Sequence, residues 1–130
     1  ILPTGYMNES NFHFYNKGKD LWQASADLRD DLEDKFRHQM EKSDLLQGFS
    51  VTSDVASGFG SLTNMMTTEY VRDEAPKAPI LLYAVEGANP FKKSEEKIKF
   101  ELCKLNKCLW LGEMLENFDM VIPFNSLYMK

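Results

Sequence analysis

The run ILLYAV, residues 80–85, constrains the fold of this chain more than any other stretch. It is continuously apolar and short, so it has neither the length nor the polar stripe of an amphipathic helix. Such a run is typical of a strand that is covered on both faces, as strands of parallel sheets are. A polar, proline-bearing loop precedes it and the segment EGANPF ends it. The run therefore predicts a short buried strand.

Two other segments have strand character. Residues 45–55, LLQGFSVTSDV, combine apolar and β-branched residues and lead into the turn SGFGS. Residues 120–124, MVIPF, predict a third strand, with Pro123 at its end or on a side that needs no hydrogen bond.

Three predicted helices alternate with these strands. The first, over 21–42, repeats apolar residues at every fourth position. The second, over 61–71, takes Ser61 as its N-cap. The third starts at Ser94. Its expected apolar face comprises Ile98, Leu102, Leu105, Leu109 and Phe118, broadened by Trp110, Met114 and Leu115.

The resulting order is helix, strand, helix, strand, helix, strand. This alternation predicts an α/β fold in which crossovers link parallel strands. We expect residues 1–19 to form a loop or extended lead-in and residues 20–130 to form one partial α/β domain. Three strands make a narrow sheet, so we expect further strands to belong to sequence on either side.

Charge and cysteine content limit the classes of function. A net charge of −5 disfavours sequence-independent binding to nucleic acid or anionic lipid, and no apolar run is long enough to span a bilayer. Cys103 and Cys108 lie five positions apart in a predicted helix, about 8 Å between Cα atoms, which is too far for a disulfide. Free thiols fit a reducing compartment.

The turn after the first strand is the candidate ligand site, because ligands bind at the carboxyl ends of strands in α/β sheets. Its candidate phosphate-binding residues supply flexible backbone or hydroxyl groups: Ser57, Gly58, Gly60, Ser61 and Thr63. However, the chain has neither the P-loop nor the dinucleotide-binding motif. Between Lys42 and Arg72 it has no basic residue.

Asp54 also opposes a bound anion at this turn. A carboxylate about 4 Å from a phosphate oxygen costs about 1 kcal/mol in water and about 4 kcal/mol at an effective dielectric constant near 20, and only a bridging cation would reverse this. His13 and His38 are the sole histidines, and no cysteine or histidine cluster has zinc spacing. The residues therefore predict no metal site and no catalytic group.

The same region resembles a known superfamily. The segment SDLLQGFSVTSD looks like the strand and turn that lead into the glycine-rich phosphate loop of tubulins, and LQGF, residues 46–49, is shared unchanged. Within that superfamily the chain more closely resembles the misato family. That likeness rests on LQGF, Asp54, the pair Gly58 and Phe59, LED at 32–34 and EY at 69–70, and it extends from about residue 20 to 124.

The resemblance implies a parallel, three-layer tubulin/FtsZ-like fold of Rossmann type and a degenerate phosphate loop. The tubulin loop GGGTGSG falls on residues 56–62, where only Gly58, Gly60 and Ser61 agree. Phe59 replaces the threonine, and Ala56, Ser57 and Leu62 replace three glycines. A phenylalanine or leucine directed at that space would exclude phosphate oxygens.

The resemblance also implies a role in mitochondrial distribution and morphology. We expect a non-catalytic, cytoplasmic, mitochondrion-associated protein with no required cofactor. Its expected partners are proteins, through tubulin-like self-association or mitochondrial outer-membrane proteins. One alternative is a polymerising GTPase that binds GTP or GDP with Mg²⁺ through Gly58, Gly60, Ser61 and Thr63. Another is an unrelated α/β enzyme whose catalytic residues lie outside this chain.

Overall fold

The computed structural model describes residues 12–86 and 97–125. Its elements, in chain order, are α2 (Asn16–Ala24), α3 (Ala26–Glu41), β1 (Phe49–Asp54), α4 (Gly58–Met66), the π-helix η1 (Thr67–Val71), α5 (Arg72–Glu74), β2 (Ile80–Glu86), α6 (Lys97–Asn117) and β3 (Met120–Asn125). Strands therefore alternate with helical segments as the sequence predicts.

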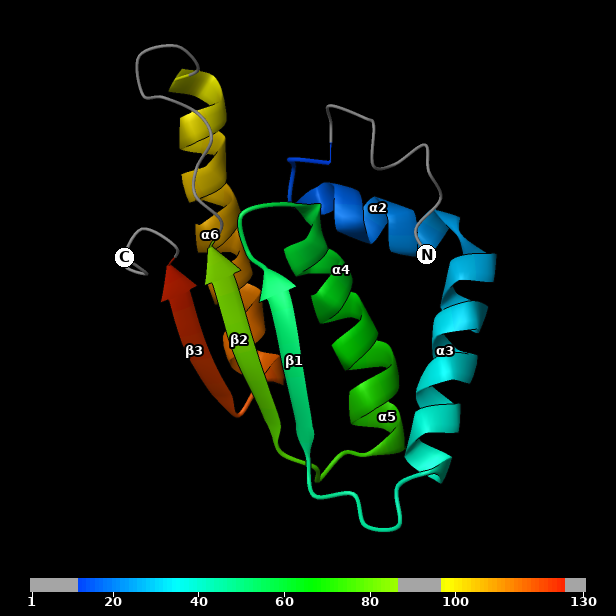
Figure 1. The fold of residues 1–130 in the computed structure, drawn as a ribbon. Coiled ribbons are helices and arrows are strands. Elements are labelled where there is room, and N and C mark those ends of the chain that lie inside the picture. The colour runs from blue at the N-terminus through cyan, green and yellow to red at the C-terminus, as the bar shows by residue number, and fades with distance from the viewer. Residues whose placement is uncertain (1–11, 87–96, 126–130) are drawn as a thin grey trace.

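The three strands form a parallel sheet in the order β1-β2-β3. Val51 pairs with Leu82, and Leu82 pairs with Val121, so the predicted strand at 80–85 is the central one. Figure 1 shows the described helices on one side of this sheet. The α/β class with a parallel sheet is confirmed, and the second helical layer of a three-layer fold is not formed by the residues described here.

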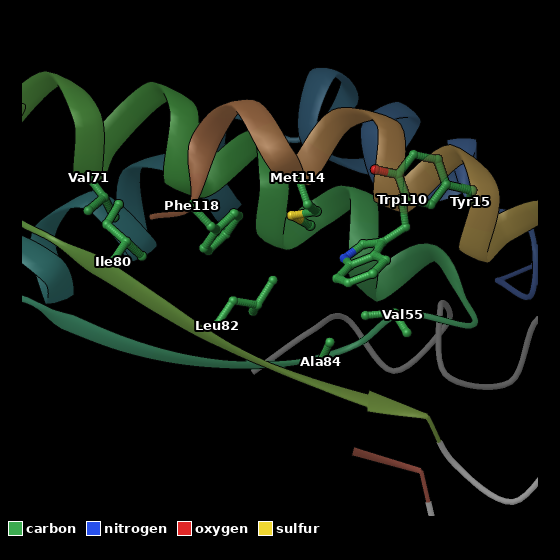
Figure 2. Packing of buried hydrophobic residues seen from close by; sticks show 9 residues of the cluster. All are labelled: Tyr15, Val55, Val71, Ile80, Leu82, Ala84, Trp110, Met114 and Phe118. Atoms are coloured by element: carbon green, nitrogen blue, oxygen red, sulfur yellow. The ribbon is translucent and has the colours of Figure 1, made fainter. Parts of the chain in front are cut away.

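The hydrophobic core lies between the sheet and the helices η1 and α6. Ile80, Leu82 and Ala84 of β2 point toward the helices and are at most 2% exposed (Figure 2). They meet Val71, Trp110, Met114 and Phe118, and Tyr15 and Val55 complete the cluster. The alternate burial of β2 explains why its sequence is continuously apolar: its other side chains are half-buried on the opposite face.

The prediction of a single helix over 21–42 is wrong, because Ser25 interrupts the helix and separates α2 from α3. Ser25 has extended backbone angles, φ −113° and ψ 95°, and its hydroxyl accepts a hydrogen bond from the amide of Leu28 as the N-cap of α3. Serine favours this position because its side chain satisfies an amide that the helix leaves unpaired. The first helix also begins at Asn16, inside the expected lead-in of residues 1–19. Residues 1–11 lie outside the described ranges.

The helix after the turn begins three residues before the predicted start. Ser57 is the N-cap of α4, and its hydroxyl accepts from the amide of Phe59. Ser61, the predicted N-cap, lies inside the helix and is fully buried. Ser57, and not Ser61, therefore caps this helix. The predicted start of the third helix at Ser94 lies outside the described residues.

The predicted apolar face of α6 is wrong in its main members. Ile98 is 86% exposed, Leu105 55% and Leu109 41%, and Leu115 is also exposed. The buried residues of α6 are Cys103, Asn106, Trp110, Met114 and Phe118, the last of which follows the helix. Because α6 has apolar residues around much of its circumference, tertiary packing decides which of them the core covers.

Candidate functional site

The candidate site is the turn that joins the carboxyl end of β1 to the amino end of α4. Asp54 organises it: one carboxylate oxygen accepts from the amide of Ala56 at 2.9 Å and the other from the hydroxyl of Ser57 at 2.6 Å. The negative charge that a helix amino terminus favours is thus supplied by the protein's own carboxylate. That Asp54 opposes a bound anion stays a prediction, with which these hydrogen bonds are consistent.

Two glycines of the turn are buried against other segments. The amide of Gly58 donates to the carbonyl of Phe12 at 2.9 Å, and a Cβ atom at Gly58 would lie 3.2 Å from the Phe12 ring. A Cβ atom at Gly60 would lie 3.2 Å from Cδ1 of Trp110. At both positions the small size of glycine allows other segments of the protein to pack closely against the backbone.

The hydroxyl groups of the predicted site are also engaged within the protein. The Ser61 hydroxyl is fully buried, within hydrogen-bond distance of the carbonyl oxygens of Tyr15 and Gly58. The Thr63 hydroxyl lies 2.9 Å from the carbonyl oxygen of Phe59 and 2.8 Å from the hydroxyl of Ser53. The structure thus brings Ser57, Gly58, Gly60, Ser61 and Thr63 together along one helix start, but it directs their groups inward.

A phosphate at this turn would compete for donors that already have acceptors. The amides of Ala56, Gly58, Phe59 and Gly60 donate respectively to Asp54, Phe12, the Ser57 hydroxyl and the Ser57 carbonyl. Phe59 itself packs edge-to-face on Phe12, with ring centroids 4.8 Å apart. As placed, these backbone amides are engaged by Asp54, Phe12 and Ser57, so a phosphate could accept from them only by displacing those acceptors.

Sequence reasoning missed Asn106, which holds the turn from the side of α6. Its amide group donates to the carbonyls of His13 at 2.5 Å and Ala56 at 2.8 Å, and its oxygen accepts from the amide of Tyr15 at 3.1 Å. The side chain is 1% exposed and fully satisfied. The available signal was a polar asparagine at helical spacing between Cys103 and Trp110.

A second missed group is Glu113, which joins three helices. Its carboxylate accepts from the Tyr15 hydroxyl at 2.9 Å, from Lys19 at 2.5 Å and from the Asn64 amide at 3.1 Å. Burial raises the pKa of Glu113, but the hydrogen bonds from Lys19 and Tyr15 outweigh burial and hold it below its ordinary value. The pKa of the Tyr15 hydroxyl is well above its usual range. Burial is the larger cause, and the hydrogen bond to Glu113 is the second.

Across 12–86 and 97–125, no three histidine, cysteine, aspartate or glutamate side chains converge as a metal site requires. In the same ranges, none of the helices has the length and apolar character needed to cross a membrane.

The parallel α/β fold and the strand-turn-helix geometry at residues 49–66 define a class of protein. The family model described as "Tubulin domain" matches residues 5–130, nearly the whole chain. The chain therefore belongs to the tubulin domain family.

Its curated relatives include misato proteins and tubulin beta chains, so the chain is similar to misato-like members of the tubulin superfamily. "Protein misato" of Drosophila melanogaster is 25% identical over 114 residues, which cover 87% of this chain and 20% of the relative. "Protein misato homolog 1" of Danio rerio is 35% identical over 109 residues, 84% of this chain and 18% of the relative. A tubulin beta-8 chain of Oryza sativa is 28% identical over 132 residues, 95% of this chain and 28% of the relative. The chain thus spans about a fifth of the length of the misato relatives.

Proposed function

We propose that this chain is part of a misato-like protein that acts in mitochondrial distribution and morphology without using a nucleotide at the β1–α4 turn. The supporting observation is the position of Asp54, whose carboxylate accepts from Ala56 and Ser57 where a phosphate would need those donors. The turn then serves as a structural joint between β1 and α4. Protein contacts, rather than hydrolysis, carry the activity.

The mitochondrial role comes from the likeness to misato proteins and not from the chemistry of the turn. We propose that the protein is cytoplasmic and associates with mitochondria through protein partners at the outer membrane. The prevailing negative charge of the chain, −5, supports a protein partner over direct binding to anionic lipid.

Nucleotide binding can be measured on the full polypeptide with a fluorescent GTP analogue and Mg²⁺. The unmodified protein is expected not to bind at micromolar concentrations. A Phe59→Thr, Leu62→Gly variant tests whether removing the two bulky side chains is enough to restore binding. An Asp54→Ser variant tests the same for the carboxylate of the turn. Its matched control is Asp44→Ser, which removes an exposed carboxylate before β1. Micromolar binding by the unmodified protein would overturn the proposal and support the GTPase alternative.

The cellular role requires a separate measurement. In cells depleted of the protein, mitochondria are expected to cluster or change shape, and the unmodified protein is expected to restore them. A Thr63→Val variant removes a hydroxyl of the predicted phosphate site while keeping the side-chain shape, so it is expected to restore them equally. Normal mitochondria after depletion would contradict the mitochondrial role and leave the nucleotide result unaffected.

A further inference from the structure

We draw no further inference here: the strongest candidate, the largely apolar cavity of about 160 Å³ between α6 and the carboxyl ends of β2 and β3, carries nothing, because its two charged side chains, Glu86 and Lys107, pair with each other and nothing in the residues that the structure describes shows what would occupy it.

Discussion

Gly18 lies directly against Gly58, and a Cβ atom added to Gly18 would overlap the carbonyl oxygen of Gly58. The same added atom would lie 2.6 Å from the amide nitrogen of Leu62. The backbones of α2 and α4 are therefore in direct contact at Gly18, with no side chain between them. This contact holds the first helix over the turn that leads into α4.

Gly18→Ala is expected to lower the free energy of unfolding by about 3 kcal/mol or more, because backbone atoms of α4 must move to admit the methyl group. Urea denaturation followed by circular dichroism measures the change. Gly112→Ala is the matched control: a Cβ atom there meets nothing within 4 Å, so it is expected to stabilise the exposed helix by about 0.5–1 kcal/mol. Equal stability of the two variants would contradict the contact between α2 and α4.

Glu69→Ala is expected to destabilise the protein by about 1–3 kcal/mol, because it removes the acceptor of a buried donor. Nε1 of Trp22 donates to the Glu69 carboxylate at 2.7 Å, and Trp22 is 1% exposed. Glu69→Gln keeps an acceptor oxygen and is expected to lose less. The two variants can be compared by urea denaturation, and an alanine variant as stable as the unmodified protein would show that water replaces the carboxylate.

Asp119 is expected to make stability depend on pH in the acid range. Its carboxylate accepts from the amide of Ile80 at 2.8 Å and from Arg72 at 3.0 Å, and these bonds hold its pKa below the ordinary value. A depressed folded pKa stabilises the native state above the unfolded pKa, about 3.9, and this stabilisation is lost as pH falls through the folded pKa.

Asp119→Asn should therefore be less stable than the unmodified protein at neutral pH, with the difference narrowing below about pH 3.9. Thermal unfolding between neutral and acidic pH measures both curves. A difference that stays constant across that range would assign the effect of Asp119 to packing or to neutral hydrogen bonding.

The two cysteines are expected to react at very different rates with a thiol reagent. Cys103 is buried, and burial raises its thiol pKa, whereas Cys108 is exposed. In dilute native protein one thiol should react quickly and the second only on denaturation. Cys108→Ser should remove the fast phase and leave the slow one, and a fast phase that survives this substitution would show that Cys103 is accessible.

The sequence predicted the strands better than the helices. The strand at 80–85 was found because its apolar run has one interpretation, while the break at Ser25 was missed because apolar residues continue at helical spacing on both sides of it. The core face of α6 could not be chosen from the sequence, since the helix has apolar residues in two directions. At the turn, the sequence placed the site residues together, but it could not show that the amide of Gly58 donates to Phe12 or that the carbonyl of Ala56 accepts from Asn106, because these contacts join distant segments.

The parallel sheet has a consequence for folding during synthesis on the ribosome. Each neighbouring pair of strands is joined through helices rather than by a hairpin, so no two strands can pair until a whole crossover has been made. On the ribosome the central strand β2 emerges with only β1 available, and it keeps an open edge until β3 has left the exit tunnel. During that interval the apolar strand β2 has an unpaired edge, which is the condition under which strands pair with other chains and aggregate.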